Sequence, residues 1–206
     1  MATRAFSISE LLNANFKYRE TGGNWQKHIG HLQHNATILV MGPPKNGKSD
    51  YCMKLVKDLA INKSRVFYNS FEEGKSSTLQ ENAIRNNMED VIGMVQFGNR
   101  EPFAELMARM KKPRSASVLV IDSWDYMHLT EKDFQTMRTE LKNKMIIIIC
   151  WAHGARPDNQ QARKIEHHAD VLVHVRNLAA SSVSRFGGNE RMKFGERKVG
   201  QGELFG

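Results

Sequence analysis

The stretch Met41–Ser49, with the sequence MGPPKNGKS, decides the fold of this 206-residue chain. It follows an apolar run at 38–40 and precedes a segment of helical spacing that begins at Asp50. The spacing G-x-x-x-x-G-K-S between a strand and a helix is typical of a loop that binds the phosphates of a nucleotide. A plain Gly/Pro turn is the alternative, and the strand before it and the helix after it both disfavour that interpretation.

Each part of this segment, which we call the phosphate loop (residues 42–49), suits a bound triphosphate. Gly42 and Gly47 let backbone N–H groups point into one hollow that a side chain would obstruct. Lys48 would bring a positive charge to the β- and γ-phosphates, and the Ser49 hydroxyl would reach Mg²⁺. The following helix N-terminus favours an anion at the same place. We expect ATP and Mg²⁺ to bind here, through Gly42, Pro43, Pro44, Lys45, Asn46, Gly47, Lys48, Ser49 and Asp50.

The size and charge of the chain limit what else it does. Its 206 residues suffice for one well-buried α/β domain. The formal net charge of +8 and the pI near 9.6 favour an anionic partner besides the nucleotide, such as nucleic acid or an acidic membrane. The basic residues are scattered along the sequence, so an ordinary solvated surface explains them as well.

Cysteine usage and hydropathy favour a cytoplasmic protein. Cys52 and Cys150 lack the spacing of a zinc site or of a secreted disulfide framework. The first residues lack the apolar core of a signal peptide, and the longest apolar run, 145–152, is too short to span a bilayer. We therefore expect two buried, reduced thiols, a cytoplasmic location and no association with a membrane.

Apolar runs alternate with segments of helical spacing along most of the chain. This alternation predicts an α/β fold with a mostly parallel central sheet flanked by helices. The uniformly apolar run at 145–150 suits a strand covered on both faces. Residues 191–194 are expected to form an antiparallel hairpin at the sheet edge, after a loop that follows 175. The predicted strands are 38–40, 65–69, 91–96, 118–122, 145–150 and 169–175, and the predicted helices are 7–12, 51–61, 77–85, 101–111 and 131–141.

Three regions differ in character. Residues 1–35 are predicted to form an N-terminal arm with a short capped helix, 36–195 the α/β core, and 196–206 a mobile tail, because the last residues are Gly-rich and charged. Trp25, in the arm, is expected to cover one edge of the sheet, with stacking on adenine as the alternative.

Acidic residues follow two of the predicted strands. Asp122 ends the run at 118–122, and Glu72 and Glu73 follow the run at 65–69. The carboxyl ends of parallel strands meet at one edge of a sheet, where the phosphate loop also lies. Asp122 is therefore the expected partner of Mg²⁺, through water or through Ser49, and Glu72 the expected base for the attacking water. The alternatives are a polar strand end for Asp122 and, for the two glutamates, a helix start that favours the dipole.

Four stretches of the chain together resemble the RecA family of ATPases, and within it the RadA/Sms branch and the DnaB-type helicases are nearest. These stretches are 42–49, 67–73 (FYNSFEE), 118–123 (VLVIDS) and 165–172 (IEHHADVL). In that family a strand ends in Ser, followed by any residue and then the catalytic glutamate. The resemblance therefore implies this role for Glu72 rather than Glu73.

The resemblance also implies a candidate that acts between subunits. Residues 184–187, with the sequence SRFG, match part of the Lys-Asn-Arg-Phe-Gly motif of the RadA branch, whose basic residues reach a neighbouring subunit's nucleotide. Val183 and Ser184 stand where the motif has lysine and asparagine, so Arg185 alone remains as a catalytic candidate in trans. The alternative is a surface arginine in a turn.

Residues beyond 150 fall where the family senses nucleotide and contacts DNA. His153 stands at the place of a polar sensor, so it either contacts the γ-phosphate as a neutral donor or caps its loop. Arg156, Arg163 and Lys164 lie in a region that resembles a DNA-contacting loop. They are expected to make non-specific, salt-sensitive phosphate contacts, or to form a solvated loop rim.

The family's accessory modules are not found in this sequence. No Cys-x-x-Cys zinc module precedes the predicted core, and neither the protease-like domain of the RadA branch nor the collar of DnaB is present. We therefore expect an ATPase core nearly without accessories, of the kind encoded by a phage or a mobile element.

The sequence as a whole favours a RecA-like ATPase that hydrolyses ATP and couples the cycle to DNA, mainly single-stranded, in recombination, repair or replication. A homo-oligomer, either ring or filament, would complete its site. Two alternatives remain open. One is a small-molecule P-loop kinase, which needs an arginine-rich lid and an acceptor pocket, and the other is a nucleotide-dependent regulatory or assembly module without significant hydrolysis.

Overall fold

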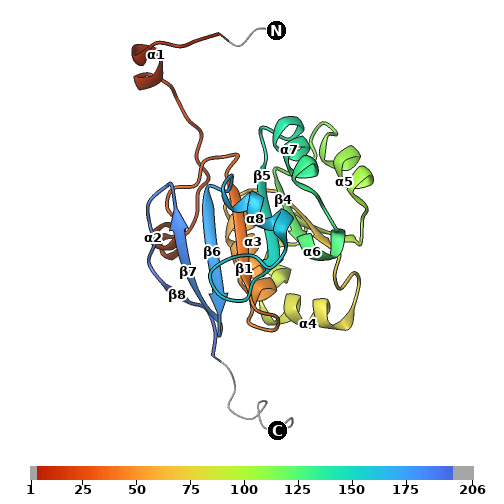
Figure 1. The fold of residues 1–206 in the computed structure, drawn as a ribbon. Coiled ribbons are helices and arrows are strands. Elements are labelled where there is room, and N and C mark those ends of the chain that lie inside the picture. The colour runs from red at the N-terminus through yellow and green to blue at the C-terminus, as the bar shows by residue number, and fades with distance from the viewer. Residues whose placement is uncertain (1–3, 197–206) are drawn as a thin grey trace.

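An eight-stranded sheet forms the centre of the computed structural model, which describes residues 4–196 (Figure 1). The strand order is β3-β2-β4-β5-β1-β6-β7-β8. The strands are β1 (Thr37–Gly42), β2 (Val66–Ser70), β3 (Val95–Asn99), β4 (Val118–Asp122), β5 (Met145–Trp151), β6 (Val171–Arg176), β7 (Ala179–Ser184) and β8 (Met192–Lys193). Of the predicted tail at 196–206, residues 197–206 lie outside the described residues.

Strands β1 to β6 all run parallel, and β7 and β8 add two antiparallel strands at one edge. The predicted class, a mostly parallel sheet flanked by helices with an antiparallel C-terminal hairpin, is confirmed. Every residue of β1, β2 and β4 is buried, as expected for strands covered on both faces.

Alternate residues of the central strands pack into two apolar layers, one on each face of the sheet. Ile38 and Ile147 lie in one layer, under α3 (Lys48–Ile61) and α2 (Gly23–Ile29). Leu39 and Ile148 lie in the other. Four helices cover that second face, namely α5 (Phe103–Met110), α6 (Trp124–Met127), α7 (Glu131–Glu140) and α8 (Gln160–Glu166) (Figure 1).

The structure corrects two of the predicted segments, one strand and one loop. The predicted strand at 91–96 is replaced by a 3₁₀ helix, η1 (Met88–Val91), and a turn at Gly93, whose φ of +85° cannot continue a strand. β3 therefore starts at Val95. The predicted loop after 175 contains β7, because Asn177 and Leu178, with φ of 52° and 56°, form a two-residue turn. A glycine would have signalled that turn, and Leu178 takes its place.

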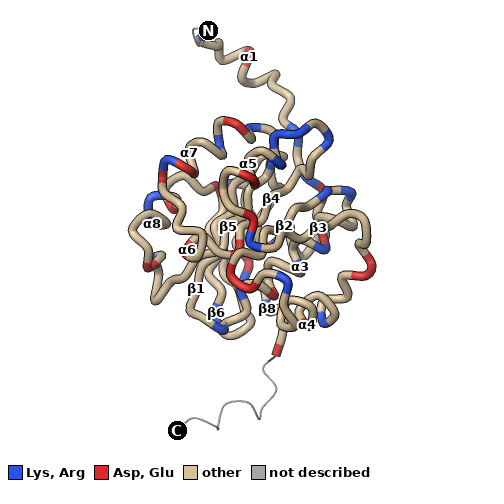
Figure 2. Tube along the Cα trace, turned by 90° about the vertical axis from the view of Figure 1, so that its right-hand side faces the viewer, with Lys and Arg blue, Asp and Glu red and all other residues tan. Residues whose placement is uncertain are grey.

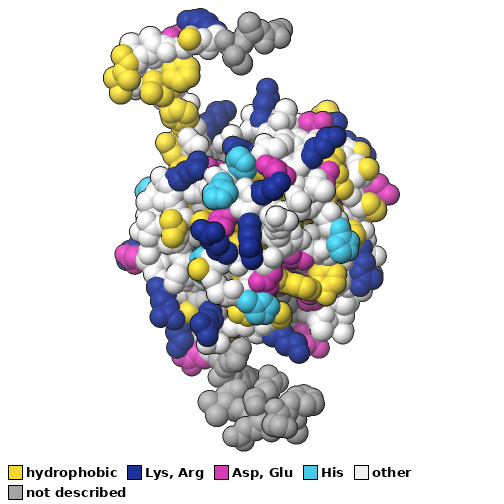
Figure 3. Space-filling view, viewed as in Figure 1, with side chains coloured by type: hydrophobic (Ala, Val, Ile, Leu, Met, Phe, Trp, Pro, Cys, Tyr) yellow, Lys and Arg dark blue, Asp and Glu magenta, His cyan; other side chains and the backbone are white. Residues whose placement is uncertain are grey.

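The N-terminal arm divides into an exposed part and a packed part. Helix α1 (Ile8–Leu12) stands away from the body (Figure 1), where its N-terminus is closed by Ser7 and Glu10. Hydrophobic side chains gather on this projecting part in Figure 3. From Arg19 onward the chain packs on the body. Trp25 is buried, and its ring packs against His28 and Tyr51.

Charge and thiols are distributed much as the sequence predicts. Lys and Arg are spread over the whole trace, with acidic residues among them (Figure 2). Cys52 and Cys150 are buried and unpaired. The described helices include none with both the length and the apolar character that crossing a bilayer requires.

Candidate functional site

The phosphate loop connects β1 to α3 at the carboxyl edge of the parallel strands. Glycine is required at two positions of the loop, because other parts of the chain approach the loop too closely for a side chain. A Cβ at Gly42 would lie 2.1 Å from the Val175 carbonyl oxygen, and one at Gly47 would lie 2.5 Å from Leu178 Cδ2. Gly47 also has a φ of +97°. The loop therefore fits against the backbone of the C-terminal hairpin, as a cradle for phosphates needs.

The turn between β6 and β7 holds the phosphate loop in place, which the sequence did not reveal. The Asn177 backbone N–H donates to Asn46 Oδ1 over 2.9 Å, and the Leu178 N–H donates to the Asn46 carbonyl over 3.2 Å. The Phe194 ring packs edge-on against Tyr51 of α3, with ring centroids 5.6 Å apart. The C-terminal strands thus support both the loop and the helix that follows it.

Lys48 is folded back onto the loop. Its ammonium donates to the carbonyls of Gly42 at 2.9 Å and Pro43 at 3.0 Å, and the residue is only 8% exposed. Burial lowers the pKa of Lys48, while the carboxylates of Glu72 and Asp122 act in the opposite direction. The lysine therefore lies in the field of both predicted acidic residues.

Asp122 ends β4 with its side chain buried. Its Oδ2 accepts a 2.6 Å hydrogen bond from the Tyr68 hydroxyl of the neighbouring strand β2, a partner that the sequence did not suggest. Burial raises the pKa of Asp122, and the hydroxyls of Tyr68 and Ser49 lower it. The peptide bond that follows, Asp122–Ser123, is cis.

The residues present fit a Mg²⁺ ion bound together with phosphates. The Asp122 carboxylate and the Ser49 hydroxyl face each other and supply the oxygen ligands that Mg²⁺ prefers. Among residues 4–196 no group of three or more His, Cys, Asp or Glu could hold a metal alone. Mg²⁺ is usually held by one or two protein oxygens, water and substrate phosphates.

The two adjacent glutamates separate into different tasks. The Glu73 carboxylate accepts from Thr78 Oγ1 at 2.6 Å and from Ser76 Oγ at 3.4 Å, so it closes the start of α4 (Ser77–Arg85). Glu72 turns the other way. Its backbone N–H donates to the Asp122 carbonyl over 3.0 Å. Burial, followed by the negative charge of Asp122, raises the pKa of Glu72, which suits a base that must take a proton.

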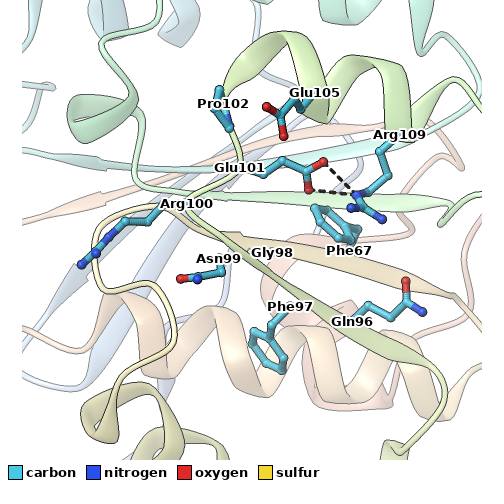
Figure 4. A pocket seen from close by; sticks show the side chains of 10 residues that line it. All are labelled: Phe67, Gln96, Phe97, Gly98, Asn99, Arg100, Glu101, Pro102, Glu105 and Arg109. Atoms are coloured by element: carbon cyan, nitrogen blue, oxygen red, sulfur yellow. Dashed lines mark hydrogen bonds and ion pairs between the residues drawn. The ribbon is translucent and has the colours of Figure 1, made fainter.

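Arg100, which sequence analysis missed, supports the turn that carries Glu72. Its guanidinium donates to the backbone carbonyls of Glu73 at 3.1 Å and Glu72 at 3.4 Å. Arg100 directly follows β3 and borders an open hollow of about 590 Å³ (Figure 4). On the other side of that hollow Arg109 pairs with Glu101 at 2.8 Å and lies over the Phe67 ring. The signal available in the sequence was only a basic residue after a strand.

Asp125 is a second residue that the sequence analysis missed. Its Oδ2 accepts from the Trp151 backbone N–H over 2.7 Å, which ties the start of α6 to the end of β5. Burial raises the pKa of Asp125, and Lys48 is near enough to oppose that shift. The acidic residue three positions after Asp122 was the signal that could have found it.

Two further predicted nucleotide contacts, His153 and Asp50, have side-chain partners of their own. His153 follows β5, and its Nδ1 lies 2.6 Å from Asp158 Oδ2, so the ring caps its own loop as one alternative expected. Asp50 accepts from Asn86 at 2.9 Å and pairs with Arg85 at 3.1 Å. Its carboxylate is thus used between α3 and the end of α4.

Two of the three predicted DNA contacts also have partners. Arg163 Nε donates to the Pro157 carbonyl over 2.7 Å, and Lys164 pairs with Glu131 at 2.9 Å. Arg156 is exposed in the segment after β5 and has no side-chain partner among the described residues. Arg156 therefore lies in the connection between β5 and α8, and Arg163 and Lys164 lie on α8 itself.

Arg185 lies far from the phosphate loop of its own chain. It follows β7, which runs antiparallel to β6, and it pairs with Asp170 at 3.5 Å. Asp170 also accepts from the Thr37 N–H at the start of β1, whereas the loop follows the end of β1. The six residues of β1 separate them by roughly 20 Å. Within one subunit this arginine cannot reach the nucleotide.

Comparisons with known proteins show the fold. No protein-family model and no curated protein matches the chain. Among solved structures, the flagellar accessory protein FlaH from Methanocaldococcus jannaschii matches with a TM-score of 0.59 and 16% identity, over 87% of this chain and 92% of that one. The KaiC-like protein PH0186 from Pyrococcus horikoshii OT3 matches with a TM-score of 0.62 and 17% identity, over 83% and 88%.

A third solved structure, described as an ATPase domain, matches with a TM-score of 0.62 and 12% identity, over 89% of this chain and 90% of that one. At these identities the likeness establishes the architecture. Together with the phosphate loop between β1 and α3, it shows that the chain has the fold of a RecA-like P-loop ATPase core.

Proposed function

We propose that the protein binds ATP with Mg²⁺ and hydrolyses the γ-phosphate, as a switch or motor coupled to DNA. One observation carries the proposal, which is that Glu72 and Asp122 lie together beside Lys48 at the carboxyl edge of the sheet. A phosphate cradle alone would explain binding. Glu72 adds a base that could accept a proton from the attacking water. Its carboxylate is half-buried, has a raised pKa and lies next to the candidate metal ligand.

Each residue has a defined task in this mechanism. Lys48 exchanges the carbonyls of Gly42 and Pro43 for the β- and γ-phosphates, since these anions are stronger acceptors than carbonyls. Bound Mg²⁺ supplies charge neutralisation between the phosphates. Asp122 and Ser49 would hold it, and Glu72 would accept a proton from the attacking water. Arg100 fixes the turn that carries Glu72.

The test of hydrolysis compares the two glutamates. Glu72→Gln keeps the shape of the side chain and removes the base, so the rate of phosphate release should fall about 10²- to 10⁴-fold. Glu73→Gln is the matched control, because Glu73 caps α4, and it should change the rate less than about threefold. Intact phosphate release in Glu72→Gln would overturn this role and would favour the small-molecule kinase. ATP binding without release in the native chain would favour the regulatory module.

We propose that the active form is a homo-oligomer. Arg185 is exposed at the edge opposite its own loop, so it can act only on a neighbouring subunit's nucleotide. An arginine supplied in this way stabilises charge that develops on the transferred phosphoryl group. The specific rate should fall on dilution, and a fully active monomer would contradict this arrangement.

The DNA half of the proposal is supported by Arg156, Arg163 and Lys164 and by the net charge of +8. We propose a role in recombination, repair or replication for this DNA coupling, and a cytoplasmic location for the protein. Phosphate release should be measured without nucleic acid, with single-stranded DNA and with duplex DNA, each at two salt concentrations. A stimulated rate that falls with salt is expected, because phosphate contacts release counterions. No stimulation by either DNA would remove this half and leave the ATPase.

A further inference from the structure

A basic hollow of about 390 Å³ lies between α2, α3 and the segment that leads into β8, and Glu72 is not among its lining residues. Four cations line it, and they come from three separate segments of the chain. Glu190 is the one acidic residue among its described lining residues. The cations are Lys27, Lys54, Arg191 and Lys193.

Two of these four charges are not compensated. Lys54 lies 3.8 Å from Asp50 and Lys193 lies 2.8 Å from Glu196. Lys27 and Arg191 are both exposed, and neither forms an ion pair with any residue from 4 to 196. Like charges gathered around one concave surface create a positive potential that favours an anion. A phosphate group, with several acceptor oxygens, is the ligand that such a set of donors suits best.

His28 lines the same hollow with a nitrogen that lacks a partner. The residue is 1% exposed, and its Nδ1 lies 2.5 Å from the Glu190 carbonyl, which can only accept. Nδ1 therefore carries the proton of the neutral ring. Nε2 is buried without a hydrogen bond to any described residue. Nε2 of this neutral ring can only accept and is closed off from solvent, so His28 shapes the wall of the hollow and does not contact a phosphate oxygen.

The hollow shares one of its walls with the phosphate loop. Met192 and Lys193 line the hollow and form β8, which pairs with the start of β7. The next residue, Phe194, would lie 3.3 Å from a Cβ placed on Gly47. Trp25, on the other wall, packs edge-on against Tyr51 with ring centroids 5.3 Å apart, and Tyr51 also packs against Phe194. A ligand that moves β8 would therefore move a support of the loop.

We propose that this hollow is a second binding site, for a phosphate-bearing ligand, and that its occupancy changes the affinity of the phosphate loop for nucleotide. The coupling rests on the proposed function, because it needs nucleotide at the phosphate loop. Binding of a ligand in the hollow does not depend on the proposed function. The proposed ligand contacts are Lys27, Lys54, Arg191 and Lys193. Free phosphorylated molecules and the phosphates of nucleic acid share this chemistry.

Two probes distinguish these sources. Inorganic pyrophosphate and a short single-stranded oligonucleotide are titrated calorimetrically into protein whose loop is saturated with a non-hydrolysable ATP analogue and Mg²⁺. The double variant Lys27→Ala/Arg191→Ala should bind the effective probe about tenfold more weakly, because two charge-assisted contacts are lost. The control Lys112→Ala/Lys142→Ala removes two exposed cations elsewhere, and its affinity should change less than about twofold.

Each outcome decides the proposal. Binding of pyrophosphate that the pocket variant weakens supports a small ligand, and binding of the oligonucleotide alone that the pocket variant weakens supports nucleic acid. Binding that the pocket variant leaves unchanged overturns the site, because the probe is then held elsewhere. Failure of both probes to bind the native protein overturns the site. Equal weakening in the pocket and control variants also overturns it, since it would report net charge only.

The coupling has its own readout. The affinity for the ATP analogue is measured with and without the effective probe, and a shift of about threefold or more is expected in the native protein and none in the pocket variant. An unchanged affinity overturns the coupling and leaves the site. If the analogue does not bind at all, the proposed function has failed, and the hollow is then tested with the same probes in a Lys48→Ala background.

Discussion

Tyr68 and Asp122 are joined by a 2.6 Å hydrogen bond between adjacent buried strands, in which the phenol donates to the carboxylate of the candidate metal ligand. The bond orients the buried Asp122 carboxyl group. It also lowers the pKa of Asp122 against the effect of burial, so it keeps the ligand closer to its charged form. Tyr68 is buried in the sheet like a core residue, and its hydroxyl also acts on the candidate metal site.

Tyr68→Phe should weaken Mg²⁺ binding while the fold is retained. The substitution keeps the ring and its packing on Phe97 but leaves Asp122 without this donor, which raises the carboxyl pKa further. We expect the half-saturating Mg²⁺ concentration for phosphate release to rise about tenfold, since a hydrogen bond to a charged group is worth about 1.5–3 kcal/mol. Tyr126→Phe, on an exposed ring, is the control and should leave the Mg²⁺ titration unchanged.

Arg100→Ala should lower the rate of hydrolysis without weakening ATP binding. Arg100 contacts the carbonyls of Glu72 and Glu73 and lies in a different strand connection from the phosphate loop. Its loss lets the turn move, so the base is displaced while the cradle is unchanged, and we expect kcat to fall about tenfold or more. Arg109→Ala, on the far side of the hollow in Figure 4, is the matched control. A changed affinity for nucleotide with normal kcat would contradict this assignment.

The rate should depend on pH through Glu72. Burial and Asp122 raise the pKa of Glu72 above its ordinary value of 4.5. The base must be ionised to accept a proton, so activity is retained above the raised pKa and is lost as pH falls through it. In Glu73→Gln the same acid limb should remain. The residual activity of Glu72→Gln should lack it, and an unchanged limb in that variant would assign the titration to another group.

The two glycines of the phosphate loop should respond differently to a second substitution. Gly47→Ala brings its Cβ to 2.5 Å from a flexible Leu178 side chain, whereas Gly42→Ala meets the Val175 backbone at 2.1 Å. Leu178→Ala should therefore recover part of the nucleotide affinity lost in Gly47→Ala, with a residual deficit of about 1 kcal/mol or more from the positive φ. It should recover nothing in Gly42→Ala. If Leu178→Ala recovered nucleotide affinity equally in both glycine variants, the contact between Leu178 and the phosphate loop would not explain the loss in Gly47→Ala.

The sequence predicted the parts of this site that depend on local pattern. Glycine spacing places the phosphate loop, and an acidic residue at the end of an apolar run places Asp122, because strand ends meet at one edge. What the sequence missed depends on contacts between distant segments. Neither the hydrogen bond from Tyr68 nor the support of Asn46 by Asn177 has a local signature. The turn at 177–178 was missed because leucine occupies a left-handed position that usually carries glycine.

Mixing two inactive variants tests whether Arg185 acts between subunits. Arg185 lies at the amino ends of β1 and β6, and Glu72 lies at the opposite edge, so a catalytic site that needs both must draw them from different chains. Glu72→Gln and Arg185→Ala should each be nearly inactive alone. In an equimolar mixture, some interfaces pair an intact Glu72 with an intact Arg185, and part of the phosphate release should return as the mixture is concentrated. Arg138→Ala, an exposed arginine over the Phe134 ring, is the control and should be active alone. If Arg185 only stabilised its own subunit through Asp170, the mixture would stay as inactive as its components, and Arg185→Ala would unfold at a lower temperature than the native protein.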